Sequence, residues 1–134
     1  MLPKKVLLAE DDSDDRDFFF DVLKDRADVV LLPAAENGED VFTYLKDTTP
    51  GDGRPDFILL DQNMPKRNGL QTVQLLKQSE AYQNIPVFIY STYADDLLAK
   101  RGTEAGAVSV FPKPYTPEGY HQIIDAILGS TSKK

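Results

Sequence analysis

Five short apolar runs, rich in branched side chains, recur along the chain and constrain its fold more than any other feature. They are Val6–Ala9, Val29–Leu32, Phe57–Leu60, Val87–Tyr90 and Val108–Phe111. Each run is too short for a buried helix and is continuous rather than alternating, which is typical of parallel strands covered on both faces. Apolar residues at helical spacing separate the runs, so the sequence predicts an α/β fold.

A strand and a helix repeated five times predict a flavodoxin-like (βα)₅ open parallel sheet with helices on both faces. Parallel neighbours need crossover connections, and the favoured strand order is 2-1-3-4-5. Ser13 is expected to open the first helix and Thr116-Pro117-Glu118 the last, which Gly129 is expected to end. The Pro- and Gly-rich segment Asp47–Asp56 is expected to be a surface loop before the third strand.

Length and composition narrow the classes of function. At 134 residues the chain has the length of one domain, so residues 1–134 are expected to form a single unit with a frayed tail at 130–134. A net charge of −7 argues against nucleic acid as a partner. The absence of cysteine suits a reducing cytoplasm. Every apolar run is far shorter than the ~20 residues that cross a bilayer, so no membrane contact is expected.

Polar residues follow four of the predicted strands, at the edge where open parallel sheets bind ligands. They are Glu10 and Asp11 after the first strand, Asp61 after the third, Ser91 and Thr92 after the fourth, and Lys113 after the fifth. Strand order 2-1-3-4-5 makes the first and third strands neighbours, so the three carboxylates should converge. Two carboxylates about 4 Å apart repel by roughly 4 kcal/mol at an effective dielectric near 20, which calls for a cation. An all-oxygen donor set with few protein groups suits Mg²⁺.

These groups are the parts that phosphoryl transfer needs: a carboxylate nucleophile, a metal, a permanent cation at Lys113 and a hydroxyl donor at Ser91. Each part alone has an ordinary interpretation. The acidic run Glu10–Asp12 can complement a helix dipole, Asp61 can belong to a turn, and Lys113-Pro114 can be a solvated turn. Their coincidence at the ends of four strands, on one edge, favours the functional interpretation.

The motifs and their order resemble the receiver domain of two-component response regulators, the family of the chemotaxis protein CheY. The stretches that carry the resemblance are Leu7–Asp12, Leu59–Pro65 with Gly69, Ile85–Val87 leading to Ser91-Thr92, Ala105–Ala107 and Lys113-Pro114. They cover nearly the whole chain. The resemblance implies a signalling phosphoacceptor, not an enzyme with a separate substrate, that catalyses only its own phosphorylation and dephosphorylation.

The resemblance also implies a role for each site residue. Asp61 would be the phosphoacceptor, and Mg²⁺ would be held by Asp61, by Asp11 directly, by Glu10 largely through water and by the backbone carbonyl of Asn63. Ser91 would be the switch hydroxyl, Thr92 would line the phosphoryl pocket, and Lys113 would be the family's lysine, followed by a cis peptide to Pro114. The implied partners are a sensor histidine kinase or a histidine phosphotransfer protein, and a downstream protein that the sequence does not name. A homodimer is left open.

One departure from the family concerns the relay of the signal. Val110 stands three positions before Lys113, where the family often has an aromatic residue whose rotamer follows the switch hydroxyl. Phe111 is expected on the opposite face, because side chains alternate along a strand. The longer loop at Asp47–Asp56 resembles that of small stand-alone regulators paired with phytochrome-like histidine kinases.

Three other classes of protein fit these residues less well than a receiver domain does. A hydrolase of the haloacid-dehalogenase type would place an aspartate two residues after Asp61, where Asn63 stands. A degenerate receiver would have lost an acid or the lysine, and a flavin-binding protein would not carry the acidic run Glu10–Asp15 at its phosphate loop. His121 is expected to be a surface residue rather than a phosphodonor. Tyr93 is expected to lean over the phosphoryl site and hinder attacking water.

Overall fold

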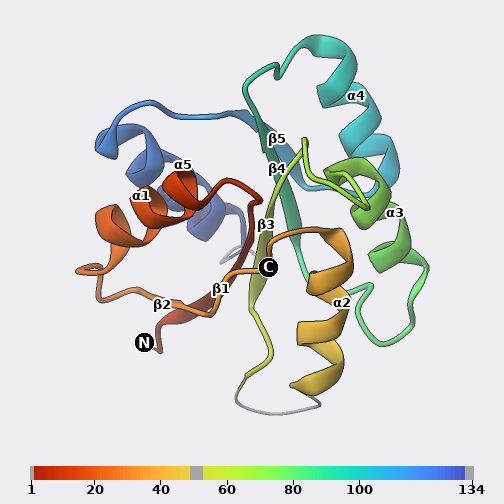
Figure 1. Ribbon diagram of the computed structural model, residues 1–134, viewed down its shortest axis with the longest axis horizontal. Helices are drawn as coiled ribbons and strands as arrows, with labels where there is room; N and C mark the ends of the chain where they lie inside the picture. The colour runs from red at the N-terminus through yellow and green to blue at the C-terminus, as the bar shows by residue number, and fades with distance from the viewer. Residues whose placement is uncertain (1, 49–52, 132–134) are drawn as a thin grey trace.

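The computed structural model describes residues 2–48 and 53–131 and contains one five-stranded parallel sheet flanked by helices (Figure 1). The strand order is β2-β1-β3-β4-β5, which confirms the predicted topology. The elements, in chain order, are β1 (Lys4–Ala9), α1 (Ser13–Leu23), β2 (Val29–Leu31), α2 (Gly38–Asp47), β3 (Phe57–Asp61), α3 (Gly69–Gln78), β4 (Val87–Ser91), α4 (Asp96–Ala105), β5 (Ser109–Pro112) and α5 (Pro117–Thr131).

Two of the polar site residues belong to the strands themselves and do not merely follow them. β3 and β4 each extend one residue beyond their run, so Asp61 and Ser91 are the last residues of their strands. Asp61 is in register with Tyr90, and Ser91 with Pro112. The ladder then holds these two side chains at the carboxyl edge of the sheet, and Pro112 is tolerated because β5 is an edge strand.

One predicted helix start is confirmed and one predicted helix end is wrong. α1 begins at Ser13, as expected, and Asp12 caps it, because its Oδ1 accepts the backbone N–H groups of Asp14 at 2.9 Å and Asp15 at 3.1 Å. Gly129 does not end α5, which continues to Thr131, since a helical glycine costs only about 1 kcal/mol relative to alanine.

Two predicted segments lie partly outside the described residues. Ser130 and Thr131 of the expected frayed tail are helical, and residues 132–134 are not described. In the expected loop Asp47–Asp56, Asp47 belongs to α2 and residues 53–56 lead into β3, while residues 49–52 are not described.

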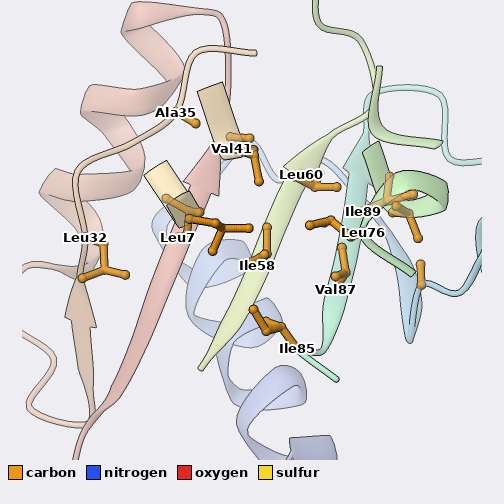
Figure 2. Close-up of a cluster of buried hydrophobic side chains, with 14 residues drawn as sticks. Leu7, Leu32, Ala35, Val41, Ile58, Leu60, Leu76, Ile85, Val87 and Ile89 are labelled. Atoms are coloured by element: carbon orange, nitrogen blue, oxygen red, sulfur yellow. The ribbon is translucent and has the colours of Figure 1, made fainter. Parts of the chain in front are cut away.

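Helices cover both faces of the sheet, with α1 and α5 on one side and α2, α3 and α4 on the other (Figure 1). The face under α2, α3 and α4 is filled by a buried cluster that includes Leu7, Ile58, Leu60, Val87 and Ile89 (Figure 2). The opposite face buries aromatic side chains together with aliphatic ones. Within residues 2–48 and 53–131, no helix is long and apolar enough to span a membrane.

Candidate functional site

The three predicted carboxylates meet at the carboxyl edge of β1 and β3. Oxygen atoms of Glu10, Asp11 and Asp61 all lie within 4.8 Å of one another. Glu10 is 0% exposed and Asp61 4%, while Asp11 lies at the surface. Glu10 is held there because its backbone N–H continues the ladder to the carbonyl of Ala35 at 2.9 Å. Adjacent parallel strands therefore bring together the acids that the sequence predicted to converge.

Lys113 lies against the same carboxylates from the end of β5. Its Nζ is 2.9 Å from Glu10 Oε1, 3.7 Å from Asp61 Oδ2 and 2.8 Å from Asp15 Oδ2. Its backbone N–H donates to the carbonyl of Ser91 at 2.9 Å, which continues the β4–β5 ladder into the site. The pKa of Lys113 is raised, because hydrogen bonds to Asp15 and Glu10 and the charges of Asp61 and Glu10 outweigh the opposing effect of burial. The lysine is thus a fixed positive charge.

Tyr90 is part of the site although the sequence did not single it out. Its hydroxyl donates to Glu10 Oε1 from beneath, and its ring centroid is 5.2 Å from Lys113 Nζ. Burial and the charge of Glu10 raise the pKa of Tyr90 well above its usual value, so the hydroxyl remains a donor. A buried tyrosine hydroxyl needs a partner, and a tyrosine just before Ser91 at the ligand edge was the available signal.

The protonation of the carboxylates reflects their crowding. Burial, followed by the hydrogen bond and the charge of Glu10, raises the pKa of Asp61 to about 8. Burial alone would also raise the pKa of Glu10, but hydrogen bonds from Tyr90, Asp61 and Lys113 outweigh it and lower that pKa. Burial and the charge of Glu10 raise the pKa of Asp11. Within the cluster, ionisation is therefore favoured at Glu10 and disfavoured at Asp61 and Asp11.

This donor set fits Mg²⁺. The cluster offers three carboxylates and no nitrogen or sulfur ligand, which is the chemistry that a hard divalent cation prefers. Burial and the charge of Glu10 raise the pKa values of Asp61 and Asp11, and a divalent cation bound there would relieve that repulsion.

Ser91, Thr92 and Asn63, the other residues predicted for the site, differ in their exposure and in their contacts. Ser91 is 1% exposed, and its Oγ accepts the N–H of Tyr93 at 3.1 Å, so its own proton remains for a further acceptor. The backbone N–H of Asn63 faces Asp61 Oδ1 at 3.4 Å. Thr92 is exposed, and within the described residues it makes no hydrogen bond to Asp61 or Lys113. A hollow beside the site is lined by Asn63, Ser91 and Tyr93, and Tyr93 is 79% exposed.

Two expectations about the end of β5 have different outcomes. Val110 and Phe111 do lie on opposite faces: Val110 packs with the aliphatic cluster, and Phe111 stacks on Phe88. The expected cis peptide before Pro114 is wrong, since no cis bond occurs within residues 2–48 and 53–131. The trans form is the lower-energy state of an X–Pro bond, and the turn into α5 is closed instead by Thr116, whose Oγ1 accepts the N–H of Gly119 at 3.1 Å.

Asp15 is the second site residue that the sequence interpretation missed. It was assigned only to the positive end of α1, yet its carboxylate contacts Lys113 directly. The sequence signal was weak, because Asp15 is one of several acids that follow β1 and open α1.

Comparisons with known proteins agree with this geometry. The family model described as "Response regulator receiver domain" matches residues 6–125. A protein-glutamate methylesterase/protein-glutamine glutaminase of Nitrosospira multiformis is 33% identical over 114 residues, which are 81% of this chain and 29% of that protein. This chain spans about half or less of the curated relatives it matches.

Two solved structures of response regulators are also similar. The phosphorylated cyanobacterial phytochrome response regulator RcpA has a TM-score of 0.77 at 25% identity, with 93% of this chain and 91% of that chain covered. The Mn²⁺-bound form of response regulator Rcp1 has a TM-score of 0.76 at 26% identity, with the same coverage of 93% and 91%. The chain therefore belongs to the response regulator receiver domain family, the phosphoaccepting domains of two-component systems.

Proposed function

We propose that this chain is the phosphoacceptor of a two-component phosphorelay, and that Asp61 receives the phosphoryl group from a phosphohistidine of a sensor histidine kinase or a histidine phosphotransfer protein. The observation that carries the proposal is the position of Asp61, a 4% exposed carboxylate with two other acids within 4.8 Å and an ammonium group at 3.7 Å. An acid so placed can act as a nucleophile toward an anionic group whose charge the surroundings balance.

The reaction follows from the residues present. A carboxylate oxygen of Asp61 attacks the phosphorus, the phosphorus–nitrogen bond of the phosphohistidine breaks, and the imidazole leaves with the bonding pair and takes up a proton. Lys113, with its raised pKa, is charged throughout and balances the oxygens of the transferred group. The Ser91 hydroxyl has a proton to donate to one of those oxygens, which would turn this side chain toward Asp61 and change the adjacent surface.

Glu10, Asp11, Asp61 and the Asn63 carbonyl would hold Mg²⁺ in this proposal. When bound, the metal would neutralise charge on the carboxylates and on the incoming phosphoryl oxygens. Tyr90 and Lys113 both contact Glu10 Oε1, which keeps that carboxylate oriented beneath the cluster. The phosphorylated state of RcpA and the Mn²⁺-bound state of Rcp1 support both parts of the proposal.

The similarity to RcpA and Rcp1 also supports a regulator of the stand-alone type served by a phytochrome-like kinase, acting in the cytoplasm on a downstream protein. In this view the chain has no enzymatic activity beyond its own phosphorylation and dephosphorylation.

Labelling with a small phosphodonor tests the proposal. The protein is incubated with acetyl phosphate and Mg²⁺, and the modified residue is located by mass spectrometry. One phosphoryl group is expected on Asp61. Asp61→Asn should abolish the label, Asp11→Asn should abolish the Mg²⁺-dependent labelling, and Asp14→Asn, on the same turn of chain but without a contact to the cluster, should leave the labelling unchanged. Full labelling of Asp61→Asn, or undiminished labelling of Asp11→Asn, would contradict the assignment.

A further inference from the structure

Asp15 binds the site lysine from a different element than the other acids do. It lies in the first turn of α1, and its Oδ2 is 2.8 Å from Lys113 Nζ, the shortest of that ammonium's three carboxylate distances. Lys113 is 12% exposed while Asp15 is 39% exposed, so the contact lies where the site opens to solvent. The pair therefore ties the end of β5 to the start of α1 across the site.

The contacts of Lys113 match the number of its donors. A lysine ammonium carries three N–H groups and no acceptor. Glu10 at 2.9 Å and Asp15 at 2.8 Å take two of them, and Asp61 Oδ2 is 3.7 Å away. Of the three contacts, the one to Asp61 is too long for a hydrogen bond, so the third N–H is available to an oxygen of a group transferred to Asp61.

Among the described residues, the Asp15 carboxylate contacts Lys113 and no other cation, whereas the Glu10 carboxylate has further partners. Glu10 Oε1 also accepts the hydroxyl of Tyr90, and Glu10 belongs to the carboxylate cluster that would hold a divalent cation. Asp15 is outside that cluster. Lysine has a flexible four-carbon stem, so one contact to Glu10 leaves the ammonium free to pivot, and a second contact from another element removes that freedom.

We propose that Asp15 is a positioning residue for phosphoryl transfer: together with Glu10 it occupies two N–H groups of Lys113 and thereby directs the third toward Asp61. This inference rests on the proposed function of Asp61. It assigns to α1 a part in the reaction that the helix-dipole interpretation of its acidic first turn does not contain.

Asp14 provides the matched control. It belongs to the same first turn of α1, its backbone N–H is bound by Asp12 as that of Asp15 is, and it is exposed. Removing either acid takes away one negative charge and one favourable contact with the helix dipole. Of these two acids, Asp15 contacts Lys113, whereas Asp14 forms no ion pair with it in the described part of the chain.

The test measures the rate of Mg²⁺-dependent phosphorylation by acetyl phosphate, with Mg²⁺ affinity and melting temperature measured on the same proteins. Asp15→Ala is expected to slow phosphorylation about tenfold, as small displacements of a catalytic group do, while Mg²⁺ affinity stays within about threefold. Asp15→Asn keeps an oxygen acceptor for the ammonium and is expected to recover part of the loss. Asp14→Ala is expected to match the wild type.

A Lys113→Ala background completes the test. Because Asp15 acts through the lysine, adding Asp15→Ala to that background is expected to cause no further loss. An Asp15→Ala protein as fast as the wild type, an equal loss in the Lys113→Ala background, or an Asp15→Asn protein as slow as Asp15→Ala would each overturn this inference alone. A wild-type protein that acetyl phosphate does not label at Asp61 would overturn the proposed function and this inference together.

Discussion

The face of the sheet beneath α1 and α5 buries Phe19, Phe57, Phe88, Tyr90 and Tyr120, whereas every buried member of the cluster beneath α2, α3 and α4 is aliphatic. The aromatic rings contact one another at edges, with centroids 5.7 Å apart for Phe19 and Tyr120 and 6.4 Å apart for Tyr90 and Tyr120. Large rigid rings in mutual contact specify the relative positions of α1, α5 and β4 more tightly than small aliphatic groups can.

The two faces also differ in how their helices contact the site and the sheet. Asp15 of α1 contacts Lys113, and Arg16 of α1 donates to the carbonyl of Glu10 at 2.8 Å. On the other face, the buried residue of α4 is Gly102, which lies against Val110. The site is therefore tied to α1 and α5, while α4 is held by a close backbone approach and few buried side chains, the condition under which an element opens most easily.

The largest expected effect concerns the aromatic face. Tyr120 is 1% exposed and contacts Phe18, Phe19 and Tyr90, so Tyr120→Ala should lower the free energy of unfolding by about 3–5 kcal/mol in urea titrations. Ile89→Val on the aliphatic face is the comparison and should cost about 0.5–1.5 kcal/mol. Should Tyr120→Ala leave too little folded protein to titrate, Tyr120→Leu should give an intermediate loss. Equal losses for Tyr120→Leu and Ile89→Val would remove the distinction between the faces.

A smaller effect is expected where α4 approaches β5. A Cβ at Gly102 would lie 2.5 Å from Val110 Cγ2, so Gly102→Ala should destabilise the protein by about 1 kcal/mol, although helix propensity alone predicts a gain of similar size. Val110→Ala should relieve the clash, so the double variant should be more stable than additivity predicts.

Gly129 in α5 is the matched control for this substitution. A Cβ there meets no atom within 4 Å, so Gly129→Ala should stabilise the protein by up to about 1 kcal/mol. If Gly102→Ala were stabilising too, the close approach of α4 would not be what holds that helix.

Arg26 links the turn before β2 to α5 through ion pairs. The stability that it contributes on this face of the sheet should depend on pH. Its Nη2 is 2.7 Å from both Asp28 Oδ2 and Asp125 Oδ1, and it also contacts the half-buried His121, which was expected to be a surface residue. The hydrogen bond from Arg26 lowers the pKa of Asp28. Since the folded pKa is below the unfolded value, the stabilisation is present above about pH 4 and is lost as pH falls through the lowered pKa.

Arg26→Met should therefore cost about 1 kcal/mol near neutral pH, and its difference from the wild type should shrink in acid. Urea titrations across that pH range measure both quantities. Lys24→Met is the control, because Lys24 pairs only with the exposed Asp21 within its own helix turn, and it should change little at any pH. A difference that grows in acid would have the wrong sign for this explanation.

The order of the strands and the edge that carries the site were predictable because both follow from local patterns and general rules. Continuous apolar runs separated by helical spacing allow few topologies, and the polar residues after four of them had to gather at one edge. Element ends were less predictable. Asp12 and Ser13 are both good capping residues, and only the three-dimensional path of the chain decides that Asp12 reaches the N–H groups of α1.

The residues that were missed depend on contacts between elements. Tyr90 looked like one more apolar residue of a strand, and its role depends on Glu10, eighty residues away in the sequence. Asp15 had a sufficient local explanation at the helix start, which concealed its contact with Lys113 from β5. Pro114 is the reverse case. A cis bond was expected there from the resemblance to the family, whereas the bond in the structure is trans.

The smallest expected effect concerns Tyr93, on the side of the site that faces α4. In the structure its ring is 79% exposed, so it covers little of Asp61, and any shielding of a phosphoryl group from water must be modest. Tyr93→Ala keeps the backbone N–H that donates to Ser91 Oγ and removes only the ring. Hydrolysis of the phosphorylated protein should therefore become faster by less than about tenfold, a change under ~1.4 kcal/mol. Tyr115→Ala, which removes a ring of similar exposure, 82%, from a different hollow than the one that Tyr93 lines, should leave the lifetime unchanged. Identical lifetimes for the wild type and Tyr93→Ala would refute shielding, and the α4 side of the site would then contribute only the Ser91 hydroxyl to the fate of the phosphoryl group.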